Sequence, residues 1–185
     1  MAEAAVRTAT PADIDEIARV QVVTWRAAYA DLLGERALAQ LDEDQVAAAW
    51  RETVRHGPAT VYLATEGEWT VGFCAAGPAP AEEIADARGA APEDAEAVGL
   101  VSTLLVEPRW GRRGHGGRLL AAAARGLRSD GARRGVCWVP EADKASIAFF
   151  ERAGWLPEGT VRTLETGGRM VREIRLTGGL DLELA

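Results

Sequence analysis

Apolar and polar positions change their spacing soon after the chain begins. Residues 4–10, AAVRTAT, alternate briefly and predict a strand. Residues 10–29 predict a helix. Their apolar side chains fall roughly along one helical face: Ile14, Ile17, Val22, Trp25 and Tyr29. Thr10, Pro11 and Asp13 supply the cap, the first-turn proline and the early acid that are typical of a helix start.

The next stretch predicts a second helix, a hairpin and a loop. Residues 34–57 are a more polar helical segment with a possible break near Leu41. Residues 59–77 hold two β-rich runs with Glu66–Gly67 between them, which predicts a hairpin. Residues 77–97 are rich in alanine, proline and acids and have no clean period. We therefore expect a mobile surface loop there.

The second half of the chain alternates strands and helices. Residues 98–108 are an apolar strand stopped by Pro108. The remaining predicted elements are a helix over 115–131, a strand over 134–140, a helix over 143–154 and two strands over 155–179. The order β-α-α-β-β-β-α-β-α-β-β predicts an α/β fold with a mixed sheet, in one domain over residues 1–185.

Composition narrows the class of protein. The formal net charge is −7, which argues against a nucleic-acid binder and against a polybasic membrane-surface protein. No apolar run is long enough to cross a membrane, and the N-terminus lacks a signal-peptide core, so we expect a cytoplasmic protein. Cys74 and Cys137 lie far apart in apolar runs, and His56 and His115 form no cluster. We expect buried thiols and no metal site.

One segment departs from the acidic background. Residues 106–120, VEPRWGRRGHGGRLL, hold four arginines and four glycines just where a helix is predicted to begin. A helix N-terminus presents unpaired N–H groups and the positive end of the helix dipole, and glycines let a phosphate approach the backbone closely. The segment therefore predicts a site for a di- or triphosphate group. A solvated turn whose arginines serve solubility is the alternative.

Two other phosphate-binding loops do not fit the spacing. A P-loop needs Gly-Lys followed by Ser or Thr, which this segment lacks. A dinucleotide fingerprint needs G-x-G-x-x-G in the first βαβ unit, whereas Gly114-x-Gly116 has no third spaced glycine and lies past the middle of the chain.

The segment LLVEPRWGRRGHGGRLL resembles motif A of the GCN5-related N-acetyltransferase (GNAT) superfamily, in which V-x-P ends a strand and (Arg/Gln)-x-x-Gly-x-(Gly/Ala) opens the next helix. DKASIAFFERAGW resembles a later motif of the same superfamily. RTATPADIDEIARVQVVTWRAAY is similar to its N-terminal helices, and GWLPEGTVRTLE to its tail. The likeness covers nearly the whole chain in the expected order.

The resemblance implies a GNAT-type mixed, mostly antiparallel central sheet flanked by helices, with acetyl-CoA as co-substrate. The pyrophosphate would lie on the backbone of residues 112–117, and the pantetheine arm along residues 104–106. The implied cofactor-binding residues are Leu104, Leu105, Val106, Arg112, Arg113, Gly114, His115, Gly116, Gly117, Arg118, Asp143 and Phe150.

Three positions depart from the family pattern. Gly111 replaces the usual Arg or Gln, although Arg112 and Arg113 can supply the charge. Asp143 replaces an Asn and loses a donor. Phe150 replaces the Tyr that often protonates the departing thiolate; a water, or Ser146 one helical turn earlier, could do this instead.

The catalytic groups are less clear from the sequence. The acetyl carbonyl needs only a backbone N–H near Leu105 or Val106 to be polarised. No general base is obvious, and no catalytic side chain is assigned. Four acids are candidates by type alone, and each is more often a solvated surface residue: Glu66, Glu68, Glu107 and Glu141.

Trp25 and Tyr29 lie four residues apart on the first predicted helix. They are either core residues or, as the resemblance implies, walls of the acceptor-substrate pocket.

Two functions follow from the resemblance. The first is an N-acetyltransferase that moves an acetyl group from acetyl-CoA to a primary amine of a small molecule or peptide, by direct transfer in a ternary complex. The second is a non-catalytic acyl-CoA-binding or sensor protein on the same fold. We expect neither nucleic acid nor membrane as a partner and leave a homodimer open.

Overall fold

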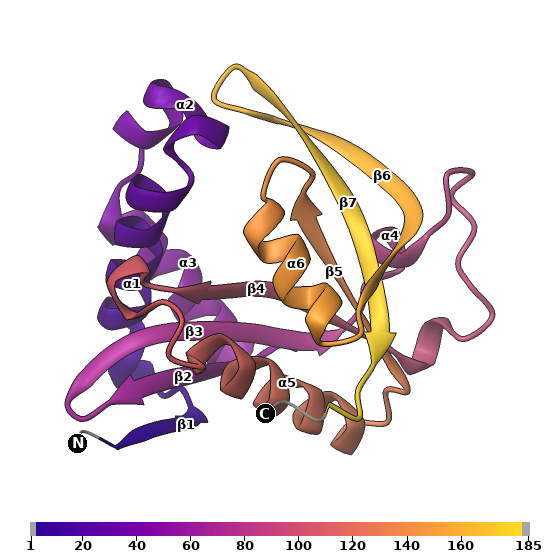
Figure 1. Cartoon of the computed structure of the whole chain (residues 1–185), viewed down its shortest axis with the longest axis horizontal. Coiled ribbons are helices and arrows are strands. Elements are labelled where there is room, and N and C mark those ends of the chain that lie inside the picture. The colour runs from indigo at the N-terminus through magenta and orange to yellow at the C-terminus, as the bar shows by residue number, and fades with distance from the viewer. Residues whose placement is uncertain (1–2, 183–185) are drawn as a thin grey trace.

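The computed structural model describes residues 3–182, whose strands form one seven-stranded sheet in the order β1-β2-β3-β4-β5-β7-β6 (Figure 1). The strands are β1 (Ala4–Thr8), β2 (Thr60–Glu66), β3 (Trp69–Pro78), β4 (Val98–Val106), β5 (Arg134–Pro140), β6 (Leu156–Thr166) and β7 (Arg169–Gly179). Neighbouring strands are antiparallel except β4 and β5, which are parallel. The predicted mixed, mostly antiparallel sheet is confirmed.

The helices are α1 (Ile14–Ala28), α2 (Ala30–Ala39), α3 (Glu43–His56), α4 (Ala81–Ile84), α5 (His115–Ser129) and α6 (Lys144–Arg152). Short 3₁₀ helices cover Pro11–Asp13, Ala95–Ala97 and Pro108–Trp110. The stretch predicted over residues 34–57 is two helices. The break near Leu41 arises because the Asp42 side chain accepts from the Gln45 backbone N–H at 3.0 Å and caps a new helix.

The predicted cap of the first helix is present. The Thr10 backbone N–H donates to Asp13 Oδ2 at 2.8 Å, and Arg7 in β1 donates to both oxygens of the same carboxylate at 2.7 and 2.8 Å. The side-chain hydrogen bond from Arg7 holds the pKa of Asp13 well below its usual range. The carboxylate thus joins the first strand to the start of the first helical segment.

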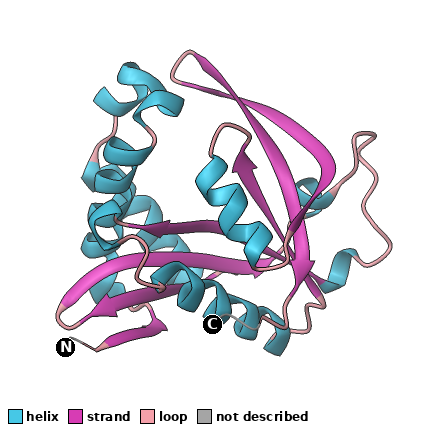
Figure 2. Ribbon diagram, viewed as in Figure 1, coloured by secondary structure: helices cyan, strands magenta, loops and turns pink. Residues whose placement is uncertain are grey.

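Helices cover both faces of the sheet (Figure 2). The two faces alternate along β3, where Cys74 and Ala76 pack in the core beneath α5, and Phe73 and Ala75 pack in the core beneath α1. The α5 side of the core is built from Leu119, Leu120, Ala123, Ala124 and Leu127. Because β3 is buried on both faces, its sequence is a nearly continuous apolar run.

The hairpin predicted over residues 59–77 is formed by β2 and β3. Its turn lies one residue later than predicted, at Gly67–Glu68, because Glu66 still pairs with Trp69. Gly67 adopts a φ of 60°, which a glycine accepts without strain.

The segment over residues 77–97, which is predicted to be a mobile surface loop, contains secondary structure and one buried anchor. The segment contains α4 and a 3₁₀ turn, and Ile84 is buried against Val98 and Val136. The buried Arg175 side chain in β7 donates to the carbonyl oxygens of Glu83 and Ala85 at 3.0 and 2.9 Å. Since these partners lie about 90 residues apart in sequence, local periodicity could not reveal the docking.

The sheet opens in its middle, between β4 and β5 (Figure 1). The two strands pair only over Val98–Leu100 and Arg134–Val136, and β4 then continues beside β3 alone. The register of β4 against β3 shifts at Ala75/Ala76, so that Ser102 is an extra residue, two positions beyond the last β4–β5 pair at Leu100. Such a bulge bends a strand and redirects its side chains.

The hairpin of β6 and β7 extends past the open part of the sheet and meets α2. Arg169 donates to the Asp31 carbonyl oxygen, and the backbone of Gly167 lies against Ala37 so closely that a Cβ there would come within 2.7 Å of the Ala37 Cβ. The C-terminal hairpin and the N-terminal helices therefore touch across the opening.

Candidate functional site

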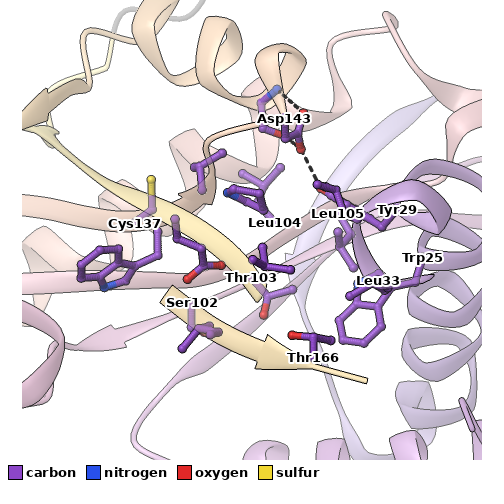
Figure 3. A pocket seen from close by; sticks show the side chains of 18 of the residues that line it. Trp25, Tyr29, Leu33, Ser102, Thr103, Leu104, Leu105, Cys137, Asp143 and Thr166 are labelled. Atoms are coloured by element: carbon purple, nitrogen blue, oxygen red, sulfur yellow. Dashed lines mark hydrogen bonds between the residues drawn. The ribbon is translucent and has the colours of Figure 1, made fainter. Parts of the chain in front are cut away.

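A cavity of about 300 Å³ lies where β4 and β5 separate (Figure 3). The β4 wall consists of Val101, Ser102, Thr103, Leu104 and Leu105. The opposite wall comes from β5, β7 and the first turns of α6, and α1, α2 and β6 supply the rest. Within the described residues no strand pairs with the β5-facing edge of β4 beyond Leu100. The backbone groups of that edge can therefore bind an extended ligand.

The charged side chains that line the cavity are both acidic: Asp143, at the start of α6, and Glu173, in β7. Arg162 donates from Nε to Glu173 Oε2 at 2.6 Å, and from Nη1 to Glu83 at 2.8 Å. Among the described residues that line the cavity there is no lysine, arginine or histidine. The walls therefore favour a positively charged ligand group.

Asp143 is the meeting point of three hydrogen bonds. Its side chain caps α6 by accepting from the Ser146 backbone N–H at 3.0 Å, and it accepts from the Ser146 hydroxyl at 2.6 Å. The Tyr29 hydroxyl, at the end of α1, donates to the same carboxylate at 3.1 Å, and the two side chains point toward one another in Figure 3. Burial and the Asp143 charge raise the pKa of Tyr29 to about 12. The phenol is therefore a neutral donor at physiological pH.

Trp25 separates this cavity from a second hollow of about 500 Å³ between α1 and α3. Trp25 and Thr103 line both spaces, and Trp50 and Asp42 line only the second. Trp25 and Tyr29 also pack against the core beneath α1. Both interpretations of these two aromatic residues therefore have a structural basis.

The predicted phosphate loop joins β4 to α5. Arg112 and Gly114 have positive φ values of 62° and 80°, and Gly114 caps α5 without any side-chain hydrogen bond to the first turn. Arg118 Nη1 donates to the Arg113 carbonyl oxygen at 3.0 Å and braces the loop. The first-turn N–H groups of α5 are thus not capped by a side chain at position 114, and positive φ values lie just before them, features that suit an anion-binding turn.

The His115 side chain is turned into the protein. It is 2% exposed, and its Nε2 lies 2.9 Å from Glu66 Oε2 at the end of β2. Arg113 donates to the other oxygen of Glu66 at 2.9 Å. Only the backbone of His115 can contribute to a phosphate site, and Glu66 fastens the loop to the sheet.

The four acids named as candidate bases all lie outside the cavity lining. Glu66 holds the loop, and the buried Glu107 pairs with Arg19 at 3.1 Å and with Arg109. Glu141 is exposed and pairs with Arg172, and Glu68 is exposed in the hairpin turn. Sequence reasoning missed Glu173, because this side chain reaches the cavity only through the pairing of β7 with β5, which no local motif records.

Phe150 lies in the cavity wall and is 4% exposed, with its ring packed against Phe149 and Trp155. It carries no hydroxyl, and the Ser146 hydroxyl that could replace one already donates to Asp143. The cavity brings Leu104, Leu105, Asp143, Phe150, Trp25 and Tyr29 together. Val106 and the loop residues 112–118 lie outside its lining, at the end of β4 and the start of α5.

Cys74 and Cys137 are both free and buried, as predicted, and burial raises the pKa of both thiols. Within residues 3–182 no three potential metal-binding side chains gather into one group. None of the helices in this range is both long and apolar enough to cross a membrane.

Comparison with known families finds a match over residues 22–155 to the Acetyltransferase (GNAT) family. A comparison with curated protein sequences found no match.

Solved structures with the same fold include three acetyltransferases. A putative acetyltransferase, yncA, from Salmonella typhimurium, with its cofactor acetyl-CoA, has a TM-score of 0.69 and 18% identity, over 98% of this chain and 96% of that one. The PaiA N-acetyltransferase of Thermoplasma acidophilum, in complex with coenzyme A, has a TM-score of 0.72 and 12% identity, over 96% and 99%. A ribosomal-protein-alanine N-acetyltransferase of Brucella melitensis has a TM-score of 0.71 and 18% identity, over 95% and 99%.

Proposed function

Because the chain belongs to the GNAT family of acetyltransferases, we propose that it moves an acetyl group from acetyl-CoA to a primary amine of a small molecule or peptide, by direct transfer in a ternary complex. The observation that carries the proposal is the cavity between β4 and β5, which joins an unpaired strand edge to acidic and aromatic walls. We further propose that residues 1–185 act as one domain and that the protein works in the cytoplasm.

The donor would bind across β4 and the loop that follows it. The pyrophosphate lies on the backbone of residues 112–117, supported by the uncapped first turn of α5 and the adjacent Arg118. The pantetheine arm lies along the free edge of Leu104–Val106 and passes Asp143 and Phe150. PaiA of Thermoplasma acidophilum, with coenzyme A, and yncA, with acetyl-CoA, have the same fold, which supports this assignment.

The acceptor would bind on the other side of the cavity, near Trp25 and Tyr29. An alkyl ammonium with a pKa near 10.4 must lose its proton before it attacks, at a cost of about 4.6 kcal/mol at pH 7. The neutral nitrogen then attacks the acetyl carbon, whose carbonyl is polarised by a backbone N–H near Leu105 or Val106. The C–S bond breaks and its electron pair leaves with sulfur. The proton lost before attack goes to solvent, and the second proton, which the nitrogen loses as it becomes an amide, goes to the departing thiolate by way of solvent.

A panel of primary amines tests this function, with release of free CoA as the readout. We expect steady release with at least one amine, and an acetylated product of matching mass. Tight CoA binding without turnover across the panel would instead support the non-catalytic acyl-CoA-binding protein, which the absence of a hydroxyl at Phe150 favours.

A further inference from the structure

We propose that the acceptor is a primary amine that carries no carboxylate, and that Glu173 selects it by binding its ammonium group before the proton is lost and the neutral nitrogen attacks. This inference rests on the acetyl transfer proposed above and narrows its acceptor class.

The first observation is that the charged side chains described in the cavity wall are all negative. Its lining contains the carboxylates of Asp143 and Glu173 and, among the described residues, no cationic side chain. An arginine or lysine would be needed to hold a substrate carboxylate, because such a group is costly to bury without a partner. The cavity offers carboxylate partners to an ammonium group and, within residues 3–182, offers no cationic side chain to a carboxylate.

The second observation distinguishes the two carboxylates. Asp143 already accepts three hydrogen bonds, from Tyr29 and from the hydroxyl and backbone N–H of Ser146. Glu173 accepts from Arg162, and that bond goes to Oε2. Its other oxygen, Oε1, has no donor among the described residues. Glu173 therefore has a free acceptor on a side chain that is only 14% exposed.

The third observation is that the nearby arginines leave this group of charges negative. Arg162 and Arg175 both stack on the Trp138 ring, with guanidinium carbons 4.2 and 5.4 Å from its centre. Arg162 is shared between Glu83 and Glu173, and Arg175 pairs with Glu158. Two positive charges thus face three negative ones. Arg162 fixes the direction of the Glu173 carboxylate without neutralising the group.

The rest of the wall suits the carbon skeleton of an amine. Trp25 and Tyr29 offer aromatic surfaces, and Leu33, Leu164 and Val171 offer aliphatic ones. Aromatic faces attract cations, so they add to the attraction of the carboxylate. An amino acid in the same place would bring its α-carboxylate next to Glu173. At a separation of about 6 Å and an effective dielectric constant of about 20, the repulsion lowers binding by a factor of about 100.

The experiment compares acceptors that differ in one carboxylate. CoA release is measured with tryptamine, tryptophan and tryptophan amide, and with 1,5-diaminopentane and lysine. We expect kcat/KM to be at least 30-fold higher for each amine than for its amino acid. Tryptophan amide should resemble tryptamine, because it keeps the bulk of the amino acid without the charge.

Two variants test whether Glu173 is the residue that distinguishes amines from amino acids. Glu173→Gln, which keeps an oxygen for Arg162, should lower kcat/KM for tryptamine about tenfold or more and reduce the preference over tryptophan. Glu141→Gln removes an exposed carboxylate outside the cavity lining and should change neither value. Thermal melting of both variants checks that the fold is intact. If Glu173→Gln does not fold, the wild-type ratios alone test the acceptor class.

The possible outcomes distinguish a failure of the proposed acceptor class from a failure of the proposed acetyl transfer. Turnover of amines and amino acids at equal kcat/KM would overturn the inference and leave acetyl transfer standing, and so would an unchanged preference in folded Glu173→Gln. Absence of CoA release with every amine would overturn the proposed function and this inference with it.

Discussion

At the scale of single residues, Tyr29 and Asp143 join two sides of the cavity. They lie 114 positions apart in the chain and meet through one hydrogen bond, and Glu173 reaches the same cavity because β7 pairs with β5.

The titration of Tyr29 tests its buried environment. The chain has two tyrosines, so Tyr62→Phe leaves Tyr29 as the one phenol that can ionise. Because burial and Asp143 raise the pKa of Tyr29 to about 12, its absorbance change near 295 nm should be centred near pH 12 rather than pH 10. The raised pKa contributes stability below pH 10 that is lost as the pH rises toward 12. A midpoint near 10 in protein that circular dichroism shows to be folded would contradict this environment.

Gly116→Glu tests the backbone site for the pyrophosphate. A Cβ at this position would lie 3.3 Å from the edge of the Phe149 ring, which a small shift can relieve, so we expect a folded protein. The added carboxylate would repel the phosphates, and CoA affinity should fall at least 100-fold by calorimetry. Arg125→Ala makes the same change in net charge on an exposed part of α5 and should bind CoA normally. Equal affinity in the two variants would show that the phosphates bind elsewhere.

At the scale of elements, sequence signals located the strands better than the helix boundaries. All seven strands were expected, because alternation and apolar runs are direct consequences of the sheet. The break expected near Leu41 is present because Asp42 caps a new helix, but the helix before it begins at Ala30 rather than at Gly34. The docking of residues 77–97 could not be predicted, because Ile84 and the carbonyl groups that accept from Arg175 find their partners on distant strands.

The start of the first helical segment provides a pH-dependent test of one element. Asp13→Ala removes the acceptor for Thr10 and the ion pair with Arg7, and should lower the free energy of unfolding by about 1 kcal/mol at pH 7. Because the pKa of Asp13 is lowered in the fold, this stabilisation is complete above about pH 4 and is lost as the pH falls through the folded-state value. Urea unfolding at pH 7 and pH 2.5 should show a smaller difference between variant and wild type at the lower pH. A difference that is constant between these two values would rule out the charge as its source.

At the scale of the whole molecule, family and fold were predictable from two motifs at a fixed separation and from the order of elements. The identity of the acceptor was not. It depends on the summed charge of walls drawn from seven elements, which come together only after folding.

Ligand stabilisation tests the whole assembly at once. Acetyl-CoA or CoA at about 100 times its dissociation constant should add about 2.7 kcal/mol to the free energy of unfolding. For a chain of this length that is an increase of about 5–10 °C in Tm. NAD and ATP at equal concentration should produce much smaller shifts in a thermal scan. A shift with NAD and none with CoA would contradict the proposed donor site.

The short ladder between β4 and β5 has a mechanical consequence. Within residues 3–182, three residue pairs join these two strands, fewer than join any other two neighbouring strands of the sheet. Two hydrogen bonds bridge the opening, one from Tyr29 to Asp143 and one from Arg169 to the Asp31 carbonyl oxygen. A pantetheine arm lying on the free edge of β4 would extend the hydrogen-bonded sheet beyond the point where β5 stops pairing with β4. The co-substrate would then act as a temporary eighth strand as well as a reactant. The protein would be more rigid in the complex with its co-substrate than in the free state.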